Sequence, residues 1–368
     1  MSFHPFEMER LMSKWENVVE YNLSESGVHP VTLGALLEMT GGMETLLATE
    51  INYPQANGLA GLRERIAAMY PGSTPDNIIV TVGCIEANFI ALQTLLRAGD
   101  EIALMMPNYM QIWGVAKNMG LAVNPLHLRE ETGWALDPGF AVTDRTKMIA
   151  VCNPNNPTGY ILSEQEMDTI VAAAEHCGAW LLADEVYAGA ERVREEQTPS
   201  FWGRYDKVLA MGSLSKAYGL PGLRIGWAVG PEKMIDDLWA RHEYITISAG
   251  MLDNHLAAAA LASDIRPKLI GRARDYIRRG YPVLQEWMES QDGLFSAVAP
   301  QAAAIAFVRY HHDINSVELV ERLMREKSVL VIPGDHFGLD HHLRISYGLD
   351  HEFLREGLRR IGELFSVL

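Results

Sequence analysis

The sequence predicts an α/β fold, in which a mostly parallel seven-stranded sheet is flanked by helices and joined to a smaller α+β domain. Two observations support this prediction. Short apolar runs alternate with helical segments between about residues 78 and 230, and several of these runs are continuously apolar, as in strands buried on both faces. After about residue 262, a long charged helix, short strands and a final amphipathic helix replace this alternation.

The expected strands of the large sheet cover residues 78–83, 101–106, 122–128, 148–154, 180–187, 207–213 and 224–230. Helical segments stand between them, for example residues 84–99 and 164–178. The second of these ends at Gly178, and glycine commonly closes a helix. Buried strands that are connected by helices favour a mostly parallel sheet.

The change of pattern after the last strand predicts two domains. Residues 46–262 form the large domain. Residues 1–45 and 263–368 form the smaller domain, which begins its second part with a charged helix over residues 266–290. No internal repeat or low-complexity linker separates the two.

The composition disfavours several classes of partner. The 368 residues include 31 Lys and Arg against 47 Asp and Glu, and the net charge of −16 argues against a broad nucleic-acid or anionic-membrane surface. The 3 cysteines are widely spaced, which predicts buried thiols in a reducing compartment. The N-terminus lacks the apolar core of a signal peptide, and no stretch reaches the ~18 apolar residues of a membrane helix. We therefore expect a cytoplasmic protein that acts on small molecules.

Polar side chains gather where the predicted strands end, and ligands bind at this edge of open α/β sheets. These side chains are Asn156, Asp184, Tyr187, Ser213, Ser215 and Lys216. The first strand runs into a glycine that begins a helix. The free backbone N–H groups near Cys84 and Ile85 therefore form a natural seat for a phosphate.

Lys216 follows an apolar run, from which lysine is normally excluded. A desolvated lysine favours its neutral amine, which can form a Schiff base with a carbonyl. A nearby aspartate such as Asp184 would keep a pyridine nitrogen protonated and the ring an electron sink. Each signal is weak alone, because buried lysines are more often structural and aspartates at strand ends often cap helices. Together they are the set that pyridoxal phosphate requires.

Six motifs, in this order, resemble the class I and II aminotransferases, the fold-type I pyridoxal-phosphate enzymes. They are Y-x4-G-x3-LR (Tyr53 to Arg63), P-x-Y (Pro107 to Tyr109), NPNNPTG (153–159), DEVY (184–187), SLSK-x7-R-x-G (Ser213 to Gly226) and R-x-S-x-G (Arg344 to Gly348). The resemblance covers roughly residues 21–364. It implies a homodimeric enzyme that exchanges an amino group between an L-amino acid and a 2-oxo acid.

The resemblance also implies how the cofactor ring is held. Lys216 would form the Schiff base and move a proton between the substrate α-carbon and the cofactor. Asp184 would pair with the ring nitrogen, and Asn156 and Tyr187 would hydrogen-bond the phenolic oxygen. Tyr109 would stack on the ring face.

The phosphate and the substrate would be bound by further matching residues. Ser213, Ser215 and Arg224 would bind the phosphate with the amides of Cys84 and Ile85, where many relatives have Ser or Thr. The resemblance implies that Arg344 binds the substrate carboxylate and that the backbone of Gly27 also contacts the substrate. Tyr53 would reach the phosphate of the neighbouring subunit.

The motifs do not identify the side chain of the substrate. The segment SESGVHP at 24–30 also resembles the capreomycidine synthase branch and, less closely, the pyridoxal-phosphate arginine oxidases, whose acidic residues near the N-terminus receive a guanidinium. Glu16 and Glu25 are candidates here, although acidic residues mostly lie on surfaces. The alternative function is therefore a lyase, cyclase or oxidase acting on a cationic amino acid such as arginine. Loss of the α-proton begins both reactions, so the cofactor motifs do not separate them.

Two other hypotheses are disfavoured. The domain resembles the effector domain of some transcription regulators, but no basic DNA-binding segment precedes Tyr53. The pairs His311–His312 and His341–His342 do not predict a metal site, because adjacent histidines point apart and no cysteine or aspartate cluster accompanies them.

Overall fold

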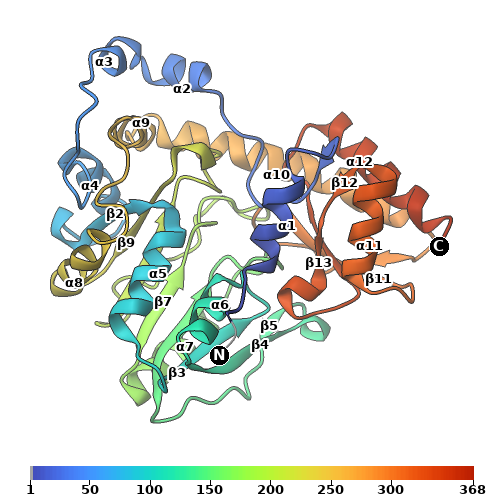
Figure 1. Cartoon of the computed structure of the whole chain (residues 1–368), viewed down its shortest axis with the longest axis horizontal. Coiled ribbons are helices and arrows are strands. Elements are labelled where there is room, and N and C mark those ends of the chain that lie inside the picture. Colours follow the sequence, from blue (N-terminus) through green and yellow to red (C-terminus); the bar gives the residue numbers. More distant parts are fainter. Residues whose placement is uncertain (1–2) are drawn as a thin grey trace.

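The computed structural model describes residues 3–368, and its largest sheet has eight strands in the order β2–β9–β8–β7–β6–β3–β4–β5 (Figure 1). The strands are β2 (Ile78–Val82), β3 (Glu101–Met106), β4 (Ala122–Arg129), β5 (Ala135–Leu136), β6 (Thr146–Cys152), β7 (Trp180–Asp184), β8 (Val208–Ser213) and β9 (Ile225–Val229). β3, β4, β6, β7 and β8 run parallel, whereas β9 is antiparallel to both of its neighbours and β5 to β4. The predicted fold class is confirmed, and the two-residue β5 is added to the seven expected strands.

The central strands are buried on both faces, as their continuous apolar runs predict. In β6, Ile149 and Val151 belong to one apolar cluster, whereas Met148 and Ala150 belong to the other. Successive side chains of a strand point to opposite faces, so each cluster covers one side of the sheet. Helices that connect parallel strands supply the covering layers.

The helices of this part of the chain are α4 (Ala60–Ala67), α5 (Gly83–Leu95), α6 (Gln111–Asn118), α7 (Glu164–Cys177), α8 (Glu232–His242) and α9 (Met251–Ala260). α7 shows why these segments begin and end where they do. Ser163 and Glu166 form a capping box at its start, and Gly178 closes it with φ of 68°. The predicted helix end at Gly178 is confirmed.

The C-terminal part forms a second, antiparallel sheet in the order β10–β11–β14–β13. Its strands are β10 (Phe295–Ser296), β11 (Ile305–Tyr310), β13 (Ile332–Pro333) and β14 (His342–Ser346), and its helices are α10 (Arg266–Glu289), α11 (Ser316–Arg322) and α12 (His351–Phe365). Figure 1 shows α10 running from beside α9 towards α12, so this one long helix connects the two sheets.

The N-terminal elements are α1 (Glu7–Trp15), β1 (Tyr21–Asn22), α2 (Leu33–Thr40) and α3 (Met43–Leu47). β1 pairs in parallel with β12 (Val329–Leu330), which ties the start of the chain to the C-terminal part. α1 lies between the two sheets, and α2 and α3 project beyond α9 (Figure 1). The domain division at residues 46 and 262 stays a prediction.

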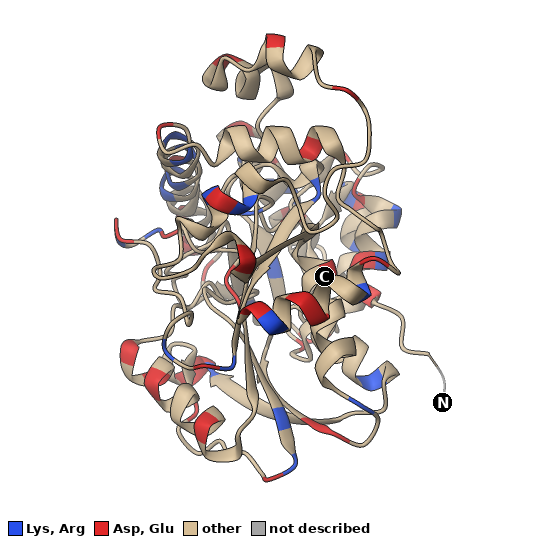
Figure 2. Ribbon diagram, turned by 90° about the vertical axis from the view of Figure 1, so that its left-hand side faces the viewer, with Lys and Arg blue, Asp and Glu red and all other residues tan. Residues whose placement is uncertain are grey.

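Charged residues are spread over many elements of the molecule. Figure 2 shows Asp and Glu on several helices, interspersed with Lys and Arg. Within residues 3–368, no helix has both the length and the apolar character of a membrane span. In the same residues, no group of three or more His, Cys, Asp or Glu side chains is arranged to hold a metal ion.

Candidate active site

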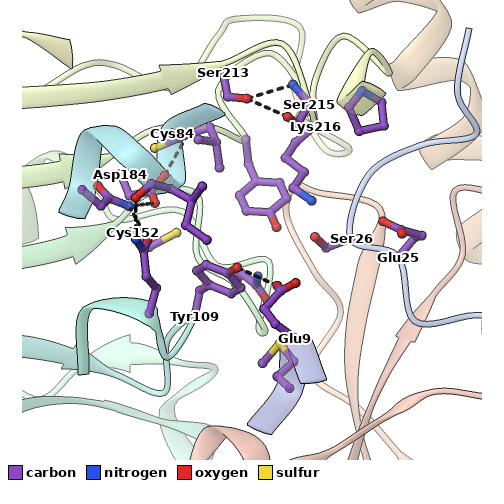
Figure 3. Close-up of a pocket in the computed structure, with 18 of the residues that line it drawn as sticks. Glu9, Glu25, Ser26, Cys84, Tyr109, Cys152, Asp184, Ser213, Ser215 and Lys216 are labelled. Carbon is purple, nitrogen blue, oxygen red and sulfur yellow. Dashed lines mark hydrogen bonds between the residues drawn. The ribbon is translucent and has the colours of Figure 1, made fainter. Parts of the chain in front are cut away.

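A cavity of about 390 Å³ lies at the carboxyl ends of β6, β7 and β8, within the size range of small-molecule sites. Its walls come from α1, the 25–26 segment, the start of α5, the strand ends and β14. It is lined by all of the site residues predicted from the sequence except Gly27 and Tyr53. Figure 3 shows Lys216 pointing into it, with Asp184 and Cys84 on one side and Glu25 and Ser26 on the other.

Lys216 lies two residues beyond the start of the turn that follows β8, and its amine faces the cavity. Burial lowers the pKa of this lysine, and the charges of Arg344 and Arg224 lower it further, against the opposing effect of Glu25. A lower pKa increases the fraction of the lysine that is present as the neutral, nucleophilic amine.

Gly27 packs directly against this lysine, although it does not line the cavity. A Cβ atom at Gly27 would lie 3.1 Å from the Ser215 carbonyl oxygen and 3.8 Å from Lys216 Cδ. The absence of a side chain therefore allows the 24–27 segment to approach the Lys216 backbone closely.

Asp184 ends β7 and is 8% exposed. Burial raises the pKa of its carboxyl group, and the hydrogen bond from Asn88 is the largest effect in the opposite direction. Asn88 Nδ2 donates to Asp184 Oδ2 at 3.1 Å, and the Val186 N–H donates to Oδ1 at 3.3 Å. A carboxylate with two fixed donors is held in a single orientation.

The start of α5 forms a cradle for an anion. Gly83 has φ of 70°, and a Cβ atom placed there would lie 2.5 Å from Arg224 Nη2. A Cβ at Gly226 would lie 2.2 Å from the Cys84 nitrogen. The two glycines therefore let the Arg224 guanidinium and the β9 backbone approach the N-terminus of the helix, where backbone N–H groups lack helical partners.

Two hydroxyl groups line the same side of the cavity. Ser213 Oγ and Ser215 Oγ lie 2.9 Å apart, and the Ser215 N–H donates to Ser213 Oγ at 2.9 Å. A guanidinium, two hydroxyls and a helix N-terminus together provide the donors that a phosphate dianion requires.

Arg344 lies in β14 and is 1% exposed. Its Nη1 donates to Asn156 Oδ1 at 3.1 Å and its Nη2 to the Ser24 carbonyl at 2.5 Å, while its buried Nε has no partner among residues 3–368. Burial lowers the pKa of this guanidinium. A buried cation with an unused donor provides a binding position for an anionic group. Because Asn156 Oδ1 already accepts from Arg344, Asn156 Nδ2 is the atom that can donate to a ligand.

Two tyrosines complete the walls. The Tyr109 hydroxyl donates to Glu9 Oε1 at 2.6 Å, and its ring packs on Phe6 with centroids 5.0 Å apart. Tyr187 is 2% exposed, and burial raises the pKa of its hydroxyl, so this group is a neutral donor.

Besides Asp184, three carboxyl groups line the cavity, and we call them the acidic wall: Glu9 from α1, Glu16 directly after the end of α1, and Glu25. Burial raises the pKa of Glu16, and the nearby charges of Glu25 and Glu9 raise it further. Like charges held close together repel each other unless a cation lies between them. This wall is therefore suited to a positively charged ligand group.

Some lining residues were not predicted from the sequence. Asn88 stands beside Asp184, Gln111 stands beside Asn88, and Glu9 belongs to the acidic wall. Asn88 follows Cys84 by four residues in α5, so helical spacing from the phosphate seat could have identified it. His29, in contrast, lies outside the lining and stacks on Tyr276 with centroids 5.9 Å apart.

Tyr53 also lies outside the cavity and is 82% exposed. Other exposed apolar side chains occur in the nearby chain, including Leu47 and Ile51. Nothing within the single chain brings Tyr53 to the site, so its expected role depends on a second subunit and stays a prediction.

The chain is similar to known proteins over most of its length. The family described as aminotransferase class I and II matches residues 43–361. Capreomycidine synthase from Streptomyces vinaceus is 32% identical over 354 residues, which cover 93% of this chain and 89% of that protein. The arginine–pyruvate transaminase of Pseudomonas aeruginosa is 29% identical over 334 residues, covering 87% and 84%. A PLP-dependent aminotransferase structure from Streptococcus suis has a TM-score of 0.92 at 29% identity, covering 100% of this chain and 99% of that one.

Proposed function

The chain belongs to the class I and II aminotransferases, enzymes that use pyridoxal phosphate, and we propose that it moves an amino group between an L-amino acid and a 2-oxo acid with the cofactor bound to Lys216. The observation that carries the proposal is the convergence of Lys216, Asp184 and the anion cradle on one cavity. When bound, pyridoxal phosphate supplies an electron sink that stabilises the negative charge left on the α-carbon after proton loss.

The anion cradle fits the phosphate of the cofactor. Ser213, Ser215 and Arg224 provide side-chain donors, and the backbone N–H groups of Cys84 and Ile85 lie at the helix N-terminus. The space next to Gly83 is filled by the guanidinium, since a Cβ there would clash with it. This supports binding of a dianion with little reliance on a side chain at position 84.

Other residues of the cavity fit the ring. Asp184 is held by two hydrogen bonds and would accept one from the ring nitrogen. Asn156 and Tyr187 each offer a donor, and both would stabilise the phenolic oxygen. Tyr109 lines the same space and would pack on the ring.

Lys216 and Arg344 would have separate roles towards the substrate. Arg344, with its unused Nε, would bind the α-carboxylate and so fix the orientation of the α C–H bond. Lys216, whose pKa is lowered by burial, would take the α-proton as its neutral amine and return it at the cofactor carbon. The backbone of Gly27, which packs against this lysine, would contact the substrate.

A homodimer would complete the site. Tyr53 is exposed in the single chain, and we propose that it donates to the phosphate in the neighbouring subunit. The projecting α2 and α3, with exposed Leu47 and Ile51, would then be covered by the partner.

A second candidate function concerns the reaction of a cationic amino acid. The acidic wall places Glu9, Glu16 and Glu25 around the same cavity, so a guanidinium or ammonium side chain would relieve their repulsion. Of the similar proteins, one is named a synthase and another an arginine–pyruvate transaminase. The substrate would then be arginine or a similar amino acid, and its reaction would be an elimination, a cyclisation or an oxidation.

One experiment tests both candidates. The holoenzyme is mixed without oxygen with glutamate, aspartate, alanine, an aromatic amino acid or arginine, and then with a 2-oxo acid, while the visible absorbance of the cofactor is recorded. Loss of the absorbance with the donor and its return with the oxo acid supports transamination. Turnover without this exchange, or turnover that needs air, contradicts it and favours the second candidate.

The acidic wall is tested in the same assay with Glu25→Gln and Glu16→Gln, against the exposed Glu232→Gln as a charge-matched control. If a cationic side chain is bound there, the two wall variants raise the KM for arginine roughly tenfold or more, because a hydrogen bond between charged groups is lost. The KM for alanine stays unchanged. Equal arginine KM values in all variants would exclude the wall as a binding site.

A further inference from the structure

A chain of amide groups leads from the α5 backbone to Asp184. Gln111 Nε2 donates to the Ile85 carbonyl at 2.5 Å, and Asn88 Nδ2 donates to Gln111 Oε1 at 3.3 Å. The same Asn88 Nδ2 donates to Asp184 Oδ2 at 3.1 Å. The chain therefore ends on the carboxylate that the proposed function assigns to the ring nitrogen.

The Ile85 carbonyl determines which group donates and which accepts in each hydrogen bond of this chain. A backbone carbonyl can only accept, so Ile85 fixes the Gln111 amide with its nitrogen towards the backbone. Gln111 Oε1 must then face Asn88, which requires the Asn88 nitrogen. Both protons of Asn88 Nδ2 are used, one on Gln111 and one on Asp184.

Stability of the fold does not explain the amide of Asn88. This residue is 2% exposed, and its Oδ1 has no hydrogen-bond partner among residues 3–368. An unpaired buried acceptor is destabilising, and an apolar side chain of similar size would avoid it. The role of the amide therefore lies in its N–H donors. The charged acceptor of these donors is the Asp184 carboxylate.

The proposed function requires Asp184 as an anion, and a buried anion needs such a donor. It is 8% exposed, and burial raises the pKa of its carboxyl group. The Asn88 hydrogen bond is the largest effect that lowers this pKa, followed by the Val186 N–H. A neutral donor stabilises the charged carboxylate without adding a cation that would compete with the ring nitrogen for it.

We propose that Asn88 is a positioning residue that holds Asp184 as an anion aimed at the ring nitrogen of the cofactor, and that Gln111 in turn fixes the Asn88 amide. The proposal rests on the proposed function, because it assumes that Asp184 binds this nitrogen. Asn88 itself need not touch the reacting atoms.

The test is Asn88→Leu, a change of similar size that removes the donor. The apoenzyme is loaded with pyridoxal phosphate labelled with ¹⁵N in the ring, and the nitrogen resonance is recorded. Protonation of the ring nitrogen falls in the variant, so its signal moves towards that of a neutral pyridine. In parallel, kcat falls roughly tenfold to a hundredfold, as expected for a hydrogen bond to a charged group. The KM for the amino donor is unchanged, because Arg344 is intact.

Two further variants make the outcome decisive. Gln111→Leu leaves Asn88 in place but frees its amide, so the nitrogen signal moves in the same direction by a smaller amount. Asp184→Asn removes the carboxylate itself. If Asp184→Asn shifts the signal and Asn88→Leu, with cofactor bound, does not, the role of Asn88 is overturned while the proposed function stands. If Asp184→Asn does not shift it either, the pairing of Asp184 with the ring fails.

Discussion

At the scale of single residues, the chemistry depends on charges placed where solvent is scarce. Burial lowers the pKa of Lys216 and raises that of Asp184, so each group is pushed towards its neutral form. For the lysine this favours the nucleophilic amine. For the aspartate it opposes the charge that the proposed pairing with the ring nitrogen needs, and the hydrogen bond from Asn88 works against the effect of burial.

The assignment of Lys216 is tested by its removal. In Lys216→Ala the cofactor cannot be bound covalently, because no other amine of the cavity lining replaces the lysine among the described residues. The holoenzyme is treated with borohydride, which fixes a Schiff base, and the peptide that carries the cofactor mass is identified. The parent and the exposed-site control Lys233→Ala carry the mass on the Lys216 peptide, whereas Lys216→Ala carries none. A label of equal yield elsewhere in Lys216→Ala would refute the assignment.

At the scale of elements, the anion cradle is made by backbone geometry more than by side chains. α5 begins at Gly83 immediately after β2 ends, and β9 runs beside β2 in antiparallel orientation. This pairing sets Gly226 opposite Thr81 and brings Arg224 to the helix N-terminus. The cradle therefore needs the two glycines, because side chains would separate the strand, the helix and the guanidinium.

Gly83→Ala tests this dependence, with Gly72→Ala as a matched control. Both glycines have positive φ, of 70° and 77°, so both variants lose about 1 kcal/mol of unfolding free energy from backbone strain. Only at Gly83 would the new Cβ meet Arg224, whereas nothing lies within 4 Å of a Cβ at Gly72. The dissociation constant of pyridoxal phosphate, measured by titration of the apoenzyme, rises at least roughly tenfold in Gly83→Ala alone. If the dissociation constant rose equally in both variants, backbone strain and not the contact with Arg224 would be the cause.

At the scale of the whole molecule, the exposed apolar side chains indicate a surface that a second chain covers. Leu47, Ile51 and Tyr53 are between 78% and 85% exposed. A monomer rarely leaves several large apolar groups in water near one another in the chain, and a twofold dimer would bury them. In the same dimer, Tyr53 would reach the cofactor phosphate of the partner.

A mixing experiment tests whether the sites are shared. In Tyr53→Ala dimers every site lacks the tyrosine, and in Lys216→Ala dimers every site lacks the lysine. In a hybrid of the two, one site carries both defects and the other carries neither. Unfolding and refolding a mixture of the two variants therefore restores activity, up to half of the parent value per hybrid. Activity no higher than that of the Tyr53→Ala dimers alone would place Tyr53 outside the partner's site.

Much of the fold and of the lining could be predicted from the sequence, because the signals were local. Continuous apolar runs predicted the seven main strands, and polar residues at their ends predicted a site that lies at the carboxyl edge of the sheet. The two-residue β5 was missed, because a strand this short leaves no periodic pattern. Of the acidic wall, Glu16 and Glu25 were candidates from the sequence, whereas Glu9 was missed, because the sequence does not show that α1 lies over the cavity.

The sequence by itself determined the fold class, the family and the residue types of the cofactor site, since each is encoded in short motifs with fixed spacing. The tertiary structure decided which of these groups meet. It placed Asn88 between Gln111 and Asp184, Asn156 against Arg344, and the carboxylates of Glu9, Glu16 and Glu25 around one cavity. These relations join residues far apart in the chain, so they depend on how strands and helices pack and not on any local pattern.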